Sequence, residues 1–231
     1  MSSPPSAADP VLIRARSAED VVVGEAIVRH RLASRAIHWS VALFFVLALL
    51  SGLPIWTPVF GWLAPFFGGL HVCRWLHPWA GLLFALAAVV MFVHWWGDMR
   101  LEGRDREWLR PRRMAAYLKH EDQDPDVGKY NGGQKLFFFA VGLGVIGLLV
   151  SGLVLWFPVI LGRGVGEAAV LLHDLTFILF VAAVIVHVYL GTAAEPGTFH
   201  SMTRGTVSRP WARLHHPRWY REVTRERPPS S

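Results

Sequence analysis

Four long stretches of the sequence contain no charged residue. They lie between Arg35 and Arg74, between Arg74 and Asp98, between Lys135 and Arg163, and between Asp174 and Glu195. An α-helix needs about 20 mainly apolar residues to cross the hydrocarbon core of a bilayer. The first stretch is too long for one helix with a short turn and contains Pro54, Pro58 and a Gly-Gly pair, so we interpret it as a helix followed by a loop. The pattern predicts an all-α integral membrane protein, a four-helix bundle with helices near residues 36–56, 75–97, 135–158 and 168–193.

Composition agrees with this prediction. Hydrophobic residues make up 53% of the chain and charged residues 17%, whereas soluble domains are about a quarter charged. Residues 1–28 contain no apolar core of signal-peptide length, and we expect them to form a polar, poorly ordered cytoplasmic tail. Residues 29–194 would then form the membrane domain, and residues 195–231 a basic cytoplasmic tail.

The basic residues are distributed unevenly between the connecting segments. Five Lys or Arg residues precede the first helix, nine lie in the segment 98–135 and seven follow Glu195, whereas the two other loops hold one each, Arg74 and Arg163. Membrane proteins concentrate Lys and Arg on the cytoplasmic side. The net charge of +6 therefore indicates topology rather than nucleic-acid binding. We expect both termini in the cytoplasm and anionic lipid, such as cardiolipin, as a partner.

A short internal repeat is present. The segment LLSGLPIWTPVFG at 49–61 resembles LVSGLVLWFPVILG at 149–162, and each is followed by a Leu-His pair. Two related helix–loop–helix halves would explain this pattern, although shared membrane composition would produce a match of this length as well.

Two of the eleven histidines lie in the fourth predicted helix, 14 residues apart, at His173 and His187. In an α-helix this spacing is only about 40° short of four full turns and corresponds to a rise of about 21 Å. Both rings would then lie on one face of the helix, one near each edge of the hydrocarbon core. Ionisable residues inside membrane helices are usually functional. A helix that supplies one histidine ligand to each of two stacked haems requires this arrangement.

The predicted topology supplies a second histidine at each depth. His77 begins the second helix from the outside and matches His173, while His38 begins the first helix from the cytoplasm and matches His187. Two bis-histidine b haems, with iron tuned for electron transfer, follow from these pairs. The single cysteine excludes an iron–sulfur cluster held by this chain alone, since a cluster needs about four thiolate ligands.

Alternatives to these roles remain at several positions. His94 lies about 100° away from the face of His77 and is best interpreted as an interfacial histidine. Met91 shares that face, so its thioether is an alternative ligand opposite His187, although packing is the commoner role of a membrane methionine. Arg74 is placed to pair with a haem propionate or to lie at the interface. A histidine-lined metal transporter is the alternative without haem, although such sites usually include carboxylates or thiols.

Several sequence blocks closely resemble the cytochrome b (gamma) subunit of membrane-bound respiratory formate dehydrogenase, from about residue 29 to residue 222. These blocks are RAIHWSVALFF, CRWLHPWAGLLF, DVGKYNGGQK, VLLHDL, VIVHVYLG and TVSRPWARLHHPRWYRE. The tail block is the most distinctive. Residues 1–28, Asp174 and the stretch 194–202 depart from the family pattern.

The resemblance implies a specific function. It implies two b haems in a four-helix bundle of the bacterial inner membrane, an iron–sulfur beta subunit, and an alpha subunit with molybdenum or tungsten on the outer face. The positions that match the outer haem are His77 and His173, and those that match the inner haem are His38 and His187. Menaquinone or ubiquinone would be reduced near the inner haem, at the positions matching the family's quinone site, Asn131, Gly133 and Gln134. Related di-haem anchors serve hydrogenases and thiosulfate or polysulfide reductases, so these partners are alternatives.

Overall fold

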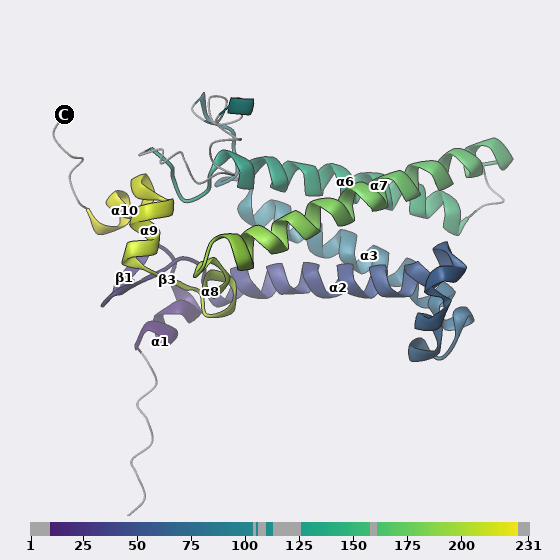
Figure 1. Cartoon of the computed structure of the whole chain (residues 1–231), viewed down its shortest axis with the longest axis horizontal. Helices are drawn as coiled ribbons and strands as arrows, with labels where there is room; N and C mark the ends of the chain where they lie inside the picture. The colour runs from purple at the N-terminus through teal and green to yellow at the C-terminus, as the bar shows by residue number, and fades with distance from the viewer. Residues whose placement is uncertain (1–9, 104, 106–109, 113–125, 158–160, 226–231) are drawn as a thin grey trace, which may run out of the picture. The chain divides into compact units, whose positions relative to one another are not determined.

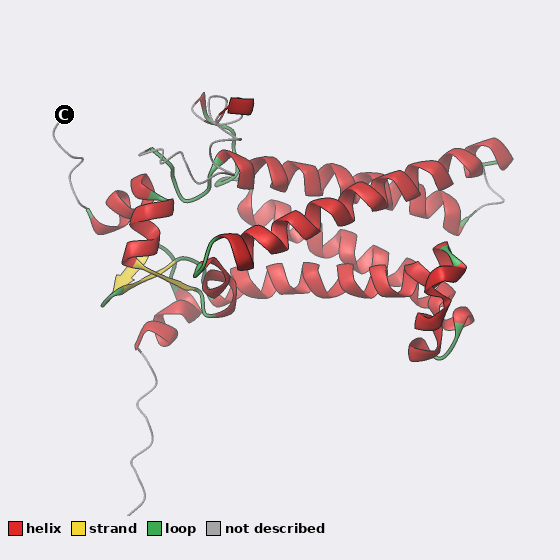
Figure 2. Ribbon diagram, in the orientation of Figure 1, coloured by secondary structure: helices red, strands yellow, loops and turns green. Residues whose placement is uncertain are grey.

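The computed structural model describes residues 10–103, 105, 110–112, 126–157 and 161–225. Long helices dominate the described chain, with three short strands (Figures 1 and 2). The chain forms two compact units. The membrane unit comprises residues 37–96 and 137–186, and the cap unit comprises residues 1–36, 97–136 and 187–231.

Among the described residues, four helices are long and apolar enough to span a bilayer, which confirms the predicted fold class. They are α2 (Leu32–Trp56), α3 (Leu70–Trp95), α6 (Gly132–Trp156) and α7 (Arg163–Tyr189), the last continued by a π-helical turn, η2 (Leu190–Ala194). Each begins three to five residues before the predicted start, because polar residues are tolerated in a first turn that lies outside the hydrocarbon core. Large apolar side chains point outward on all four helices, among them Leu43, Leu86, Leu143 and Leu179. Such surfaces suit lipid rather than water.

The loop after α2 contains a 3₁₀ helix, η1 (Pro58–Phe67). The Thr57 hydroxyl caps its start by accepting a hydrogen bond from the backbone N–H of Val59. Gly68 and Gly69 end it with φ angles of +91° and +112°, which residues other than glycine rarely adopt. The predicted loop with its Gly-Gly pair is therefore a capped element that reverses the chain into α3.

The N-terminal segment corrects a prediction. Residues 10–28 form a helix, α1 (Pro10–Ser17), and a hairpin, β1 (Val21–Val23) and β2 (Ala26–Val28), rather than a poorly ordered tail. Strand β3 (Thr206–Ser208) pairs antiparallel with β2, with Ile27 opposite Val207. The polar composition concealed this structure because the stabilising contacts come from the other end of the chain. Residues 1–9 of the predicted tail lie outside the described residues.

The C-terminal segment completes the cap unit with α8 (Thr198–Thr203), α9 (Arg209–His215) and α10 (Pro217–Thr224). The sequence pattern of aromatic and basic residues here suits a membrane surface, but the structure buries the aromatic rings. They form the core of the cap unit together with apolar residues of the strands. The core residues are Ile27, Val207, Trp211, Ala212, Trp219 and Tyr220.

Candidate functional site

The membrane unit brings His77 of α3 and His173 of α7 together. Their ring centroids lie 6.1 Å apart and the ring planes are inclined by 80°. Both side chains are partly buried. The structure thus joins the two histidines that the sequence assigned to one haem, from helices that are almost 100 residues apart in the chain.

The Nδ1 atom of each ring has a hydrogen-bond partner on the preceding long helix. His77 Nδ1 lies 2.9 Å from the Ala48 carbonyl oxygen, and His173 Nδ1 lies 2.9 Å from the Ser151 hydroxyl. A carbonyl oxygen only accepts, so His77 donates its Nδ1–H and keeps the lone pair on Nε2. Ser151 donates its one hydrogen to the Gly147 carbonyl at 2.6 Å and therefore accepts from His173. The lone pair on Nε2 of each ring is therefore available to a metal, the arrangement that metal-binding histidines have.

The internal repeat explains this arrangement. Ser51 and Ser151 are both buried, and each donates to the carbonyl four residues earlier at 2.6 Å. The glycine after each serine packs against a histidine. A Cβ on Gly52 would lie 2.7 Å from His77 Cε1, and one on Gly152 would lie 3.5 Å from His173 Cε1. In each half, the glycine of the repeated Ser-Gly pair thus packs against a histidine on the following helix.

A layer of three phenylalanines lies two helical turns from the histidine pair. Phe45 of α2, Phe84 of α3 and Phe180 of α7 have ring centroids 5.3 to 5.7 Å apart. Phe84 follows His77 by seven residues, and Phe180 follows His173 by seven. Seven residues are almost two turns and a rise of about 10 Å, so these residues share the face of their histidines. The contacts show that α3 and α7 run in the same direction in register.

In the cap unit, Asn131 and Gln134 form a reciprocal cap at the start of α6. Asn131 Oδ1 accepts from the Gln134 N–H at 2.9 Å, and Gln134 Oε1 accepts from the Asn131 N–H at 3.0 Å. This capping box uses both amide oxygens and fixes the conformation of the turn around Gly133. The NH2 groups of the two amides can donate hydrogen bonds to a carbonyl oxygen of a ligand.

The segment before this turn is held by a buried arginine. Arg29 donates to the Lys129 carbonyl, and its guanidinium lies 5.5 Å from the Tyr130 ring centroid, 5.3 Å from that of Trp211 and 5.0 Å from that of Trp219. Burial lowers the pKa of Arg29, but a guanidinium stays protonated at neutral pH. A cation enclosed by aromatic faces is attracted to their electron density. Arg29 therefore ties the aromatic tail block to the Asn131 turn.

A histidine of the tail block holds the same segment. His216 is fully buried, and its Nδ1 lies 2.7 Å from the Gly128 carbonyl oxygen. Burial, together with the nearby Arg29 charge, lowers the pKa of His216 well below its ordinary value. The ring is therefore neutral at pH 7 and donates its Nδ1–H, so this histidine has a structural role.

The comparisons with known proteins identify the family. Residues 29–205 match the family described as prokaryotic cytochrome b561. The chain belongs to this family. As a member of the cytochrome b561 family it is a multi-pass membrane protein that carries haem b.

The curated relatives of this cytochrome confirm the resemblance seen in the sequence. The nitrate-inducible formate dehydrogenase cytochrome b556(Fdn) subunit of Escherichia coli strain K12 is 36% identical over 201 residues, covering 85% of this chain and 91% of the relative. The formate dehydrogenase cytochrome b556(fdo) subunit of the same strain is 34% identical, covering 86% and 94%. The formate dehydrogenase cytochrome b556 subunit of Haemophilus influenzae is 32% identical, covering 85% and 83%.

The His77 and His173 pair fits a haem of this cytochrome. An imidazole nitrogen binds a first-row metal at about 2 Å, so two rings on opposite sides of one iron have centroids about 6 Å apart. The observed separation of 6.1 Å agrees. The Nδ1 bonds to Ala48 and Ser151 leave Nε2 of both rings as the nitrogen that would bind the iron.

The structure places the other predicted residues separately. His38 lies in the membrane unit and His187 in the cap unit, so their pairing stays a prediction. The helix α7 is continuous from Arg163 to Tyr189, as the shared face of His173 and His187 requires. Arg74 is exposed near the start of α3.

The two competing ligands and the unmatched acid also have defined surroundings. His94 packs edge-on against Trp95 at 4.8 Å. Met91 packs against the core of the membrane unit, which agrees with a packing role. Asp174 is partly buried beside His173 and interacts electrostatically with its ring.

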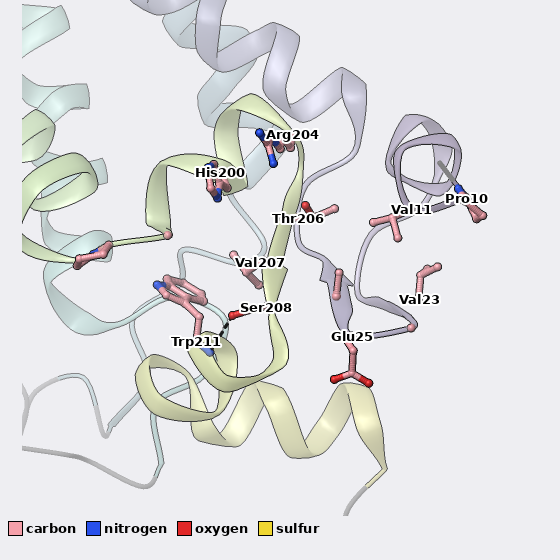
Figure 3. Close-up of a pocket in the computed structure, with 14 residues that line it drawn as sticks. Pro10, Val11, Val23, Glu25, His200, Arg204, Thr206, Val207, Ser208 and Trp211 are labelled. Carbon is pink, nitrogen blue, oxygen red and sulfur yellow. Dashed lines mark hydrogen bonds between the residues drawn. The ribbon is translucent and has the colours of Figure 1, made fainter. Parts of the chain in front are cut away.

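A pocket of about 590 Å³ opens in the cap unit between α1, the hairpin turn and α8 (Figure 3). His200 of α8 and Arg204, which directly follows α8, line it, and Val11 and Val23 contribute apolar surface. Its lining contains none of the residues predicted to bind haem or quinone. We assign it no part in electron transfer.

Proposed function

We propose that this chain is the membrane anchor and electron-transfer subunit of a formate:quinone oxidoreductase. The observation that carries the proposal is the His77 and His173 pair, whose rings are oriented for metal binding inside an apolar bundle. The names of the relatives indicate which complex is proposed, since each relative is named as a subunit of a formate dehydrogenase.

The proposal assigns four histidines to two b haems as axial ligands. His77 and His173 would hold the outer haem, and His38 and His187 the inner haem. When bound, the two haems supply one-electron transfer across the bilayer. Arg74, one turn before His77, is placed to neutralise a propionate of the outer haem.

The phenylalanine layer supports the second pair. Phe45 and Phe180 are in contact, 5.3 Å between centroids. His38 precedes Phe45 by seven residues, and His187 follows Phe180 by seven. Because α2 runs opposite to α3 and α7, helical periodicity predicts that both histidines reach one level, about 10 Å beyond the phenylalanine layer. The two haem levels would then lie about 20 Å apart.

The proposed partners come from the resemblance to the cytochrome b subunit of respiratory formate dehydrogenase and from the names of the relatives. By that resemblance, electrons would enter from an iron–sulfur beta subunit, which takes them from a molybdenum or tungsten alpha subunit on the outer face. The single cysteine of this chain cannot hold an iron–sulfur cluster, which agrees with this division of cofactors. By the positive-inside bias, both termini would lie in the cytoplasm and the helices in a bacterial inner membrane, where the basic segments would meet anionic lipid such as cardiolipin.

The quinone site would lie at the start of α6, near His187. Asn131, Gly133 and Gln134 form the turn, and the amide NH2 groups of Asn131 and Gln134 would donate to a carbonyl oxygen of menaquinone or ubiquinone. The capping box holds these amides in fixed positions, so little ordering is needed when quinone binds. Protons for the reduced quinone would come from the cytoplasm.

An Asn131→Asp substitution separates quinone binding from helix capping. Aspartate caps a helix as well as asparagine does, but it replaces the amide donor with a carboxylate. We expect the KM for quinone to rise about fivefold, since a neutral hydrogen bond is worth about 1 kcal/mol. Haem content and haem reduction by formate should be unchanged. The measurement is steady-state quinone reduction by the purified complex.

An Asn131→Ala substitution is the matched variant, because it removes the cap as well as the donor. It should raise the KM for quinone and also lower stability by about 1 kcal/mol, measured by thermal unfolding. Wild-type KM values in both variants would remove Asn131 from the quinone site.

A further inference from the structure

We propose that Ser151 is a positioning residue for His173, which fixes the plane of its ring and lowers the reduction potential of the haem that it binds. This inference rests on the proposed ligation by His77 and His173. The Ser151 side chain is 1% exposed, and its hydroxyl lies 2.9 Å from His173 Nδ1. The same hydroxyl lies 2.6 Å from the Gly147 carbonyl. The serine is thus fixed by its own helix while it accepts from the histidine.

The two halves of the repeat differ at this point. Ser51 is 0% exposed and bonds to the Leu47 carbonyl at 2.6 Å, as Ser151 bonds to that of Gly147. His77, packed against the first repeat, bonds to the Ala48 carbonyl. His173 bonds to the carbonyl at the equivalent position, that of Leu148, and in addition to the Ser151 hydroxyl. The glycine of each Ser-Gly pair therefore contacts a histidine, but within the described part of the chain only the Ser151 hydroxyl bonds to an imidazole of these two.

The expected consequence follows from the direction of the hydrogen bond. An acceptor on Nδ1–H places more electron density on the imidazole and makes Nε2 a more basic ligand. A more basic ligand stabilises ferric over ferrous iron, which lowers the reduction potential. Removing the acceptor should raise the potential of this haem and allow the His173 ring to rotate from its orientation 80° from His77.

The test is a redox titration of the purified complex that carries Ser151→Ala, followed by haem absorbance. We expect two haems per chain, with one midpoint potential raised by about 59 mV, which corresponds to a tenfold loss of preference for ferric iron in a one-electron couple. Ser151→Thr, which retains the hydroxyl, should restore the wild-type potential. Ser151→Cys, a close isostere with a weaker acceptor, should give an intermediate shift and serves if the alanine variant does not fold.

Ser51→Ala is the matched control, since it removes an equally buried serine with the same bond to its own helix. It should leave both potentials unchanged. Electron paramagnetic resonance gives a second readout, because perpendicular axial rings produce a strongly anisotropic ferric signal that Ser151→Ala should weaken. Unchanged potentials and an unchanged signal in Ser151→Ala, or equal shifts in Ser51→Ala, would overturn the proposal. A wild-type haem content in His173→Ala would instead contradict the ligation itself.

Discussion

Replacing Gly52 with alanine is expected to remove one of the two proposed haems from the protein. The new Cβ would lie 2.7 Å from Cε1 and 2.8 Å from Nδ1 of His77, closer than such atoms approach. The ring must move, which breaks its bond to the Ala48 carbonyl and misdirects Nε2. Overpacking of this kind destabilises by roughly 1–3 kcal/mol, but the larger loss is that of an axial ligand. Haem extraction from the purified chain should give about one haem in place of two.

Gly152→Ala is the matched control from the other half of the repeat. Its Cβ would lie 3.5 Å from His173 Cε1 and 3.8 Å from Nδ1, which is ordinary van der Waals contact. This variant should keep both haems and the wild-type spectrum. Retention of two haems by Gly52→Ala would contradict the placement of a haem ligand at His77.

On the proposed function, replacing His173 with alanine is expected to stop electron flow from formate to quinone. His173 is the α7 side chain that lies opposite His77, so the proposed outer haem would lose an axial ligand. We expect one haem per chain and a fall in formate-dependent quinone reduction of more than about 100-fold, beyond the upper end of what loss of a ligand's hydrogen-bond partner causes. Absorbance spectra and steady-state rates of the purified complex measure both effects.

His94→Ala is the control for this variant, because it removes another histidine of the membrane unit that packs against Trp95. It should retain both haems and most of the activity. If His94→Ala lost a haem while His173→Ala kept both, the ligand assignment would be wrong.

The four membrane helices and the His77 and His173 pair were predictable from the sequence alone. Long charge-free stretches determine the helices, since a backbone in lipid must satisfy its own hydrogen bonds. The depth of each histidine follows from its place in a helix whose direction the loop charges set. The partners on the preceding helices were not predictable, because Ser151 and Gly52 contact histidines only once the rotation of each helix is fixed.

The repeat contained the missing signal. The Ser-Gly pair is identical in both halves, and each half continues to a Leu-His pair. Composition alone would explain apolar residues at these positions, but not a buried serine followed by glycine on both occasions. The signal becomes interpretable when a histidine is known to face each pair.

The cap unit was not predictable because its contacts join distant segments. Its strands have three residues each, and β2 pairs with β3 across about 180 positions of sequence. Arg29 gave no sign of its aromatic surroundings, since Trp211 and Trp219 lie near the other end of the chain. A polar composition therefore predicted a loose tail where long-range packing forms a compact unit.

A reduced-minus-oxidised absorbance spectrum of the purified chain, combined with the haem-to-protein ratio, tests the central claim most directly. Two bis-histidine sites predict b-type bands and two haems per chain. A chain that binds no haem, or one whose haem content does not respond to His77→Ala and His173→Ala, would contradict the account.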